Sequence, residues 1–311
     1  MQMLSRRQLG KVALGCLPVV LRAAPGGSVR VGAATESFHD FSRKPGRDNV
    51  DEIITALTAS GVTEIDLASE HTEAPSADTG LPPPPPPGPY GGPPAGFTPA
   101  ELAARARALR ENLRKWRLAT PASHYAKLKS RFDGAGITVF AMSFRHDEAF
   151  TDDEIEATFG HAKALGVDVI SSRAALPMVH RLAPFAERHD VTLAFRNDRE
   201  NAAEISAMAA VSPRCRINLD IGNLTAANQQ AVAFIQENHQ KITHLIVKDR
   251  TRNNGGNEAF GSGDTPIQPV LALLRDKQLP IRAYVDYEYV GLGTPQEEIR
   301  KCLAYVRAAL A

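Results

Sequence analysis

Short runs of β-branched and aliphatic residues alternate with helical patterns along most of the 311-residue chain. Strands that alternate with helices build a parallel sheet, and eight such units close into a barrel more readily than they form an open sheet. No glycine-rich GxGxxG follows the first run, which disfavours a doubly wound dinucleotide-binding sheet. We therefore predict an α/β fold, a single-domain (β/α)8 TIM barrel. The eight predicted strands are 29–34, 62–67, 137–143, 167–172, 191–196, 215–220, 242–248 and 281–288.

Start and stop signals divide the helical stretches from these strands. Thr151 and Glu154 have capping-box spacing, and Thr294 precedes a proline that opens the last helical stretch. Gly61, Gly136 and Gly166 each stand between a helical run and the next predicted strand, where a helix C-terminus favours glycine. These signals support the alternation of helix and strand.

The first 27 residues have the composition of an export signal. Arg6 and Arg7 form a twin-arginine pair, an apolar stretch runs from Val12 to Leu21, and small residues follow at Ala23 and Ala24. We expect residues 1–27 to be a twin-arginine leader and residues 28–311 to be the barrel. This leader predicts a periplasmic or extracellular protein.

A proline-rich insertion at 74–96 interrupts the alternation after the second strand. It contains Pro82–Pro87 in an unbroken row, which favours polyproline II or irregular coil. In a barrel this insertion would lie on the face where the strands end. It would serve as a lid or as a ligand for a proline-reading domain, or it is a tolerated low-complexity insertion.

Charge and cysteine content limit the partners. The net charge is +1, with acids and bases mixed along the chain, so we expect neither nucleic acid nor a membrane surface as partner. A small molecule, neutral or weakly charged, is the expected ligand. After the leader, Cys215 and Cys302 are too few for a disulfide framework, and we expect both to be reduced and buried.

Charged residues gather where the predicted strands end. Residues two apart in a strand share a face, and the carboxyl ends of barrel strands converge on one cavity, where catalytic residues collect. Two further residues, Glu36 and His71, follow the first and second strands and could reach that cavity. The strand-end candidates are Asp66, Arg196, Asp198, Asn218, Asp220, His244, Lys248, Asp286 and Glu288.

Several motifs resemble those of the xylose-isomerase-like TIM-barrel superfamily, a group described as sugar phosphate isomerases and epimerases. They are Ile65–Leu67, Leu219–Asn223, Val247–Arg250, Gly261–Pro266 and Asp286–Tyr289. The resemblance covers nearly the whole chain after the leader. It implies a divalent metal that binds two sugar oxygens and acidifies the carbon between them. Its implied ligands are an acid on strand five, an aspartate on strand six, a histidine on strand seven and a glutamate on strand eight.

The chain matches that implied ligand set only in part. Asp220 matches the strand-six aspartate, and Asp286 falls at the strand-eight glutamate, one methylene shorter. Arg196 stands at the strand-five acid and Ile246 at the strand-seven histidine. By the same resemblance, Asn223 replaces a substrate-binding histidine, and Arg252 lies where relatives can place an arginine on the substrate.

A guanidinium has no lone pair and keeps its proton, so Arg196 cannot ligate a metal ion. We hypothesise that Arg196 replaces the metal, and that its fork pairs with Asp220, Asp286 or both and keeps them ionised. No cofactor is then required. The competing arrangement is a displaced site for Mn, Zn, Co or Mg. It would use Asp198, Asp220, Asp286, Glu288 and perhaps His244.

Two functions from different classes follow. The first is a sugar or polyol isomerase, epimerase or lyase that moves a proton beside a carbonyl, and the second is a non-catalytic barrel that binds a carbohydrate or a partner protein. Metal-dependent phosphoester or abasic-site cleavage is disfavoured, because the strand ends lack the histidines it needs. For the enzyme we expect Asp286, Glu288 and Lys248 to be catalytic. The expected substrate-binding residues are Arg196, Asp198, Asp220, Asn223, Arg252 and His71.

Overall fold

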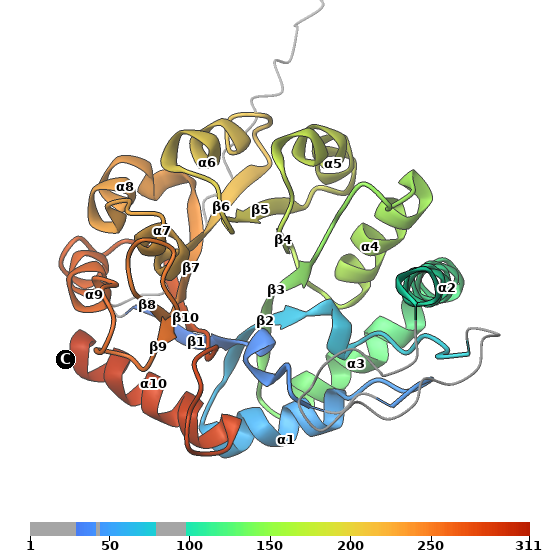
Figure 1. The fold of residues 1–311 in the computed structure, drawn as a ribbon, viewed down its shortest axis with the longest axis horizontal. Helices are drawn as coiled ribbons and strands as arrows, with labels where there is room; N and C mark the ends of the chain where they lie inside the picture. Colours follow the sequence, from blue (N-terminus) through green and yellow to red (C-terminus); the bar gives the residue numbers. More distant parts are fainter. Residues whose placement is uncertain (1–28, 42–43, 79–97) are drawn as a thin grey trace, which may run out of the picture.

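The computed structural model describes residues 29–41, 44–78 and 98–311, and in it eight parallel strands close into a barrel (Figure 1). The predicted fold class is confirmed. The leader 1–27 and most of the insertion 74–96 lie outside the described residues. The barrel strands, in spatial order, are β1 (Val31–Ala34), β10 (Arg282–Val285), β7 (Ile242–Val247), β6 (Cys215–Asp220), β5 (Thr192–Arg196), β4 (Val169–Ser172), β3 (Thr138–Phe144) and β2 (Glu64–Ala68).

Helices surround the barrel and cover its outer surface (Figure 1). Aliphatic strand residues such as Leu67, Leu193, Leu219 and Leu245 are fully buried in one large apolar cluster, which supplies most of the hydrophobic stabilisation. The helices are α1 (Val50–Ser60), α2 (Pro99–Ala119), α3 (Ala122–Gly134), α4 (Asp152–Ala164), α5 (Leu176–His189), α6 (Ala202–Met208), α7 (Ile221–Ala226), α8 (Ala231–Asn238), α9 (Ile267–Asp276) and α10 (Pro295–Leu310). Three 3-10 turns, η1 (Thr35–Phe38), η2 (Ser69–His71) and η3 (His239–Lys241), and a two-stranded ribbon of β8 (Asp249–Arg250) and β9 (Asn257–Glu258) complete the described part.

The predicted helix signals act locally as expected, with one exception. Thr294 forms a complete capping box with Glu297, and Gly61 ends α1 in the left-handed conformation at φ 68°. Thr151 accepts a hydrogen bond from the Glu154 backbone N–H, but Glu154 does not complete a capping box. Its carboxylate instead binds Arg110 and Arg117 of α2, each at 2.7 Å. Thr151 therefore still caps α4, and tertiary ion pairs have replaced only the return contact from the Glu154 carboxylate.

The last barrel strand is shorter than the predicted run 281–288. It ends at Val285, and the Asp286 N–H makes a final bond to the Val247 carbonyl at 2.9 Å. The next backbone N–H, of Tyr287, donates to Ser37 Oγ at 2.8 Å and so turns the chain out of the sheet. Asp286 and Glu288 consequently lie on the loop at the barrel mouth.

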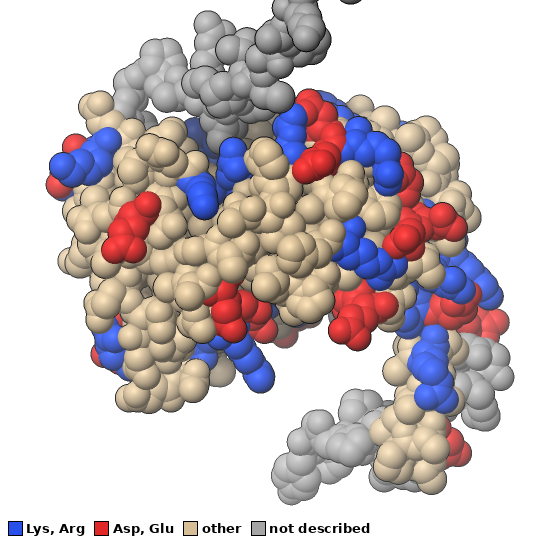
Figure 2. All heavy atoms as spheres, turned by 90° about the horizontal axis from the view of Figure 1, so that it is seen from above, with Lys and Arg blue, Asp and Glu red and all other residues tan. Residues whose placement is uncertain are grey.

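The surface agrees with the expected balance of charge. Acidic and basic side chains are interspersed on the face that Figure 2 presents, without an extended patch of one sign. Among the described helices, none is long and apolar enough to cross a membrane. Cys215 and Cys302 are both free and buried, as predicted.

Candidate functional site

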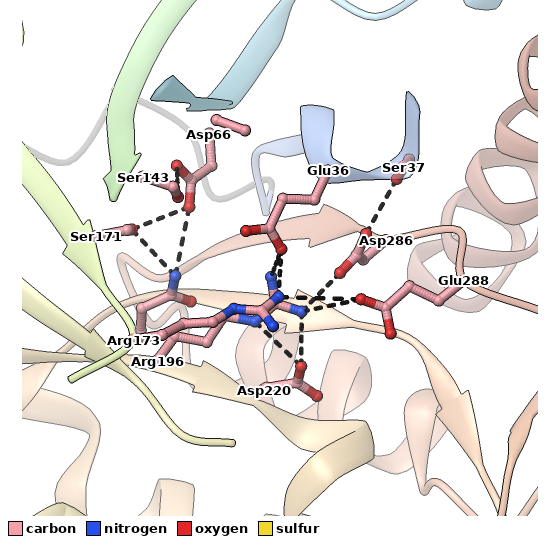
Figure 3. A network of polar contacts seen from close by, with 12 residues as sticks. Glu36, Ser37, Asp66, Ser143, Ser171, Arg173, Arg196, Asp220, Asp286 and Glu288 are labelled. Atoms are coloured by element: carbon pink, nitrogen blue, oxygen red, sulfur yellow. Dashed lines mark hydrogen bonds and ion pairs between the residues drawn. The ribbon is translucent and has the colours of Figure 1, made fainter. Parts of the chain in front are cut away.

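The side chain of Arg196, the last residue of β5, occupies the centre of the barrel mouth (Figure 3). It is 4% exposed. Its Nη2 donates to Asp220 Oδ2 at 2.8 Å and to Asp286 Oδ2 at 2.6 Å, and its Nη1 donates to Glu36 Oε2 at 2.6 Å. The sequence predicts that Arg196 pairs with Asp220, Asp286 or both, and both contacts are present; η1 contributes a third carboxylate. One guanidinium thus joins acids from three separate elements.

Asp220 is fixed by the start of α7. It ends β6, and its Oδ1 accepts the Asn223 backbone N–H at 2.8 Å as the N-cap of that short helix. Asn197 holds the same residue by donating to the Asp220 carbonyl at 3.1 Å and accepting its N–H at 2.8 Å. Gly222 lets α7 approach Lys248, because a Cβ at Gly222 would lie 2.6 Å from Lys248 Cγ.

The two aspartates have fully buried side chains, and burial together with the neighbouring charges shifts their pKa values in opposite directions. Burial raises the pKa of Asp286 to about 6, because Glu288 and Glu36 add to desolvation while Arg196 opposes it. For Asp220, burial also disfavours the anion, but Lys248 and Arg196 outweigh it and lower the pKa. As expected, Arg196 favours the ionised form of both carboxylates, but at Asp286 burial and the neighbouring acids outweigh it, and the pKa stays above its usual value.

An outer layer of charge lies between these aspartates and solvent. Lys248 Nζ donates to Glu288 Oε2 at 2.8 Å and lies 3.2 Å from Asp220 Oδ2. Burial would raise the pKa of Glu288, but Lys248 and Arg196 lower it to about 2. Arg173 donates to Glu36. The side chains of Glu288, Arg173 and Glu36 are 25%, 17% and 11% exposed, so a ligand can reach this layer.

Asn223 and His71 are buried and engaged by the protein, contrary to their predicted substrate-binding role. Asn223 Nδ2 donates to the Asn197 carbonyl at 3.0 Å, and its Oδ1 accepts from Arg250 at 2.7 Å. The ring nitrogens of His71 lie 3.1 Å from Asn49 Oδ1 and 2.9 Å from the Thr35 carbonyl. Because these atoms already have hydrogen-bond partners within the protein, both side chains have a structural role.

Asp198 and Arg252 also lie apart from the Arg196 cluster. Asp198 is exposed on the loop after β5, where its backbone N–H donates to Glu200 at 2.7 Å, so it does not share the inward face with Arg196. The strand ends at Arg196, and the expectation that alternate residues share a face therefore fails at Asp198, two residues later. Arg252 is half-buried, and its backbone N–H donates to Asp264 at 2.9 Å.

Two cluster members had weaker sequence signals. Arg173 directly follows β4, so the strand-end rule finds it once the strand boundary is known. Ser37, on η1, donates to Asp286 Oδ1 at 3.1 Å, and nothing in the sequence pattern marks it.

The donor set does not fit a divalent ion at the centre of the mouth. Carboxylate oxygens of Glu36, Asp286 and Glu288 lie within 4.8 Å of one another, a spacing compatible with a cation. The Arg196 guanidinium already contacts Glu36 and Asp286, however, and carries the charge that an ion would bring. Ile246 is fully buried and offers no ligand atom.

A second polar network lies deeper in the barrel (Figure 3). Asp66 accepts hydrogen bonds from Ser143 Oγ at 2.6 Å and Ser171 Oγ at 2.9 Å. His244 Nε2 lies 3.2 Å from Asp66 Oδ2, and Asn218 donates to Ser171 at 3.1 Å. His244 is therefore committed to Asp66, which removes it from a displaced metal site.

A cavity of about 220 Å³ opens beside this mouth, between the ends of β2 and β3 and helix α2. Glu36 belongs to its wall as well as to the Arg196 cluster. The cavity is smaller than the ~300–1,000 Å³ pockets that hold drug-sized ligands. A small ligand could thus contact the outer charged layer and fill this cavity together.

Comparison with known proteins places the chain in a family. The xylose isomerase-like TIM barrel family matches residues 95–309, and the chain belongs to it. No curated protein sequence matches the chain.

Solved structures of the same fold share little sequence with it. The probable 3-DHS dehydratase AsbF of Bacillus anthracis superposes with a TM-score of 0.59 at 11% identity, covering 90% of this chain and 98% of the other. A D-psicose 3-epimerase gives 0.58 at 12% identity, covering 90% and 99%. A sugar phosphate isomerase/epimerase of Parabacteroides distasonis gives 0.57 at 13% identity, covering 93% and 98%.

Proposed function

We propose that this protein is an acid–base enzyme that moves a proton beside the carbonyl of a small carbohydrate, as an isomerase, epimerase or lyase. The observation that carries the proposal is the single guanidinium of Arg196 bonded to Asp220, Asp286 and Glu36 at the barrel mouth. That arrangement keeps a dense set of acids and bases together with no need for a central metal ion. The family match and the sugar-epimerising and dehydratase neighbours support the substrate class and the chemistry.

The exposed edge of the cluster supplies the groups that would touch substrate. Glu288 would take the proton from carbon, and Lys248 and Arg173 would stabilise negative charge on the substrate oxygen. Delivery of a proton to the opposite face of the same carbon gives an epimer. Return of the proton to the neighbouring carbon, with transfer of that carbon's hydroxyl proton to the former carbonyl oxygen, completes an isomerisation.

The buried acid tunes this transfer. Glu288 and Asp286 are close enough to titrate as a pair, so the proton held with a pKa of about 6 belongs to the pair. A pKa near neutrality suits a group that must both accept and donate a proton. Asp286 is fully buried and acts through Glu288, as a positioning residue.

Solvent deuterium exchange tests the proposal. Purified protein is incubated in D2O with D-fructose, L-ribulose or D-psicose, with EDTA present, and exchange beside the carbonyl is followed by NMR. We expect exchange that survives EDTA and falls at least a hundredfold in Glu288→Gln, in line with loss of a general base. Exchange that requires added metal would contradict the metal-free proposal. If none of the sugars shows exchange, the proposal that the protein is an enzyme is refuted.

A carbohydrate-binding barrel without catalysis is the second candidate. Its support is that Asp220, Asp286, Glu36 and Glu288 already have cationic partners, so the site is electrostatically complete without a ligand. Such a protein would show ligand-dependent stabilisation, roughly 2.7 kcal/mol at a hundredfold Kd, with no deuterium exchange.

Export is a separate part of the proposal. Residues 1–27 would direct the folded protein across the membrane by the twin-arginine route, to the periplasm or beyond. Changing Arg6 and Arg7 together to lysine should retain the protein in the cytoplasm on cell fractionation. Unchanged export of that variant would refute the assignment.

A further inference from the structure

Helix α10 and the loop before it present an apolar surface that no described element covers. The helix lies on the outside of the barrel, where it packs against α9 and α1 (Figure 1). In the loop that leads into it, Val290 and Leu292 are fully exposed, whereas the other large apolar side chains that the structure describes are at most 47% exposed. Two fully exposed aliphatic side chains so close together mark a surface that binds something.

Three hollows lie next to one another on this surface, with volumes of about 560, 540 and 510 Å³. Leu292 and Lys301 line both the first and the second hollow, and Tyr305 lines both the first and the third. The hollows therefore form one continuous groove, which we call the α10 groove. Small side chains of the helix leave room in it: Ala304, Ala308 and Ala309.

The middle hollow of the α10 groove carries charge of both signs. Glu297 and Arg300 are exposed, and the Lys301 side chain is 64% exposed. All three line this hollow together with Leu292 and Ala304. Glu297 and Lys301 are four residues apart in a helix, so the carboxylate and the ammonium group lie on one face, one turn apart. A protein partner must therefore offer a base, an acid and an apolar side chain within the same short distance.

A second copy of the chain offers that pattern. A two-fold axis that crosses α10 at the level of Ile299 makes the two helices antiparallel, and every contact then occurs twice. Glu297 and Lys301 are each two residues from that level, so each Glu297 comes level with Lys301 of the other copy. Leu292 lies beside the same turns, because it lines the middle hollow with Glu297 and Lys301, and it therefore faces the corresponding hollow of the other copy.

We propose that the α10 groove binds a second copy of this chain, in a two-fold dimer with antiparallel α10 helices. Leu292 of each copy enters the hollow beside Ala304 of the other, and Glu297 of each copy pairs with Lys301 of the other. The chemistry proposed at Arg196 and Glu288 uses residues of one chain, so this inference goes beyond the proposed function and does not depend on it.

Sedimentation equilibrium over a dilution series of the purified full chain tests the dimer. The wild type is compared with Leu292→Glu and with Leu118→Glu, and the thermal midpoint of each variant shows whether the fold is retained. Leu118 lies on α2, outside the α10 groove, and is 47% exposed. We expect a wild-type mass of two chains. Leu292→Glu should raise the dissociation constant of the dimer by at least roughly tenfold, and Leu118→Glu by less than about twofold.

Two charge-reversed variants test the antiparallel arrangement. In a dimer of Glu297→Lys, bases would face bases, and in a dimer of Lys301→Glu, acids would face acids, so both dimers should be weaker than the wild type. In the mixed dimer every such contact pairs a lysine with a glutamate. An equimolar mixture, with one variant labelled with ¹⁵N, should therefore show the mixed dimer in excess over both homodimers by native mass spectrometry.

Three results would overturn the inference. A wild-type protein that remains a single chain over the whole dilution series would refute the dimer and leave the proposed function standing. Equal weakening by the two leucine variants would refute the placement of Leu292 at the contact. A mixture without an excess of the mixed dimer would refute the antiparallel pairing of Glu297 with Lys301.

Discussion

Two buried polar networks lie inside the same barrel, one at its mouth and one deeper, and they are held together differently (Figure 3). The mouth network joins four carboxylates through Arg196 and Lys248, and its edge reaches solvent at Glu288. The deeper network surrounds a single carboxylate, Asp66, with serine hydroxyls, an amide and His244. Its members other than Ser143 are almost completely buried.

The proposed function assigns the chemistry to the mouth network, because the two networks act differently on the pKa values of their carboxylates. Burial would raise the pKa of Asp66, but His244, Ser143 and Ser171 outweigh it. The pKa therefore lies below its usual range, and this deeper carboxylate is held as an anion. At the mouth, crowding of acids instead raises the pKa of Asp286 to about 6. A network that is almost entirely buried, in which only Asn218 Oδ1 has no hydrogen-bond partner within the described residues, contributes structure, whereas a crowded network with an open edge can exchange protons with a ligand.

The largest effect is expected from Arg196→Met. It would leave Asp220 and Asp286 buried without their common partner, which costs about 3–5 kcal/mol when a buried ion pair is broken. Urea unfolding measures the loss. The control is Arg181→Met on the surface, whose pair with Asp152 is worth about 0–1 kcal/mol. Equal losses in the two variants would mean that the guanidinium does not hold the mouth together.

The second prediction concerns pH. The folded pKa of Asp286, about 6, lies above its ordinary 3.8, so its contribution to stability is full below pH 3.8 and is lost as pH rises through 6. The free energy of unfolding of the wild type minus that of Asp286→Asn should therefore fall by roughly 1–3 kcal/mol between pH 4 and 7. Asp152→Asn, at an exposed position, is the control. A difference that stays flat or rises with pH would contradict the raised pKa.

Asp66→Asn in the deeper network should affect stability more than chemistry. It would place an amide N–H₂ against His244 and the two serines, and a buried mismatch of this kind costs about 1–3 kcal/mol. Unfolding at pH 7 measures the cost, and the exchange rate per folded molecule should stay within about threefold of wild type. A hundredfold loss of exchange with an unchanged midpoint would place Asp66 in the reaction and erase the contrast between the networks.

The smallest effect is expected at Asp198, which the strand pattern assigned to the site and the structure exposes to solvent. Asp198→Asn should alter the free energy of unfolding by less than about 0.5 kcal/mol, as is usual for surface positions. Exchange should remain within twofold. A larger fall in the exchange rate, comparable to that of Glu288→Gln, would show that Asp198 takes part in the reaction.

The sequence alone was sufficient for the barrel, because period-two strands, capping residues and glycine stops all indicate the same repeating unit. It also predicted that Arg196 pairs with Asp220, Asp286 or both, since all the strands of a parallel barrel end around one mouth. It failed where the chain leaves a strand: Asp198 turns outward, whereas Asn223 turns inward and binds Arg250. Those outcomes depend on backbone turns and on distant partners such as Ser37, which no local pattern encodes.

Helix α2 illustrates the same limit. Its arginines have the spacing of an ordinary solvated face, yet Arg110 and Arg117 point to Glu154 on another helix and help to form the cavity. The paired residues are 37 and 44 positions apart in the sequence, so these contacts depend on how the helices pack around the barrel.

The central claim, that Arg196 stands where a cation would otherwise lie, is tested most directly by calorimetric titration of Mn²⁺, Co²⁺ and Zn²⁺. The EDTA-treated wild-type protein is compared with the double variant Arg196→Glu, Ile246→His, which restores an acid and a histidine beside Asp220 and Asp286. The account predicts that only the double variant binds one ion per chain at the mouth. One ion per wild-type chain, lost on Asp220→Asn, would contradict it.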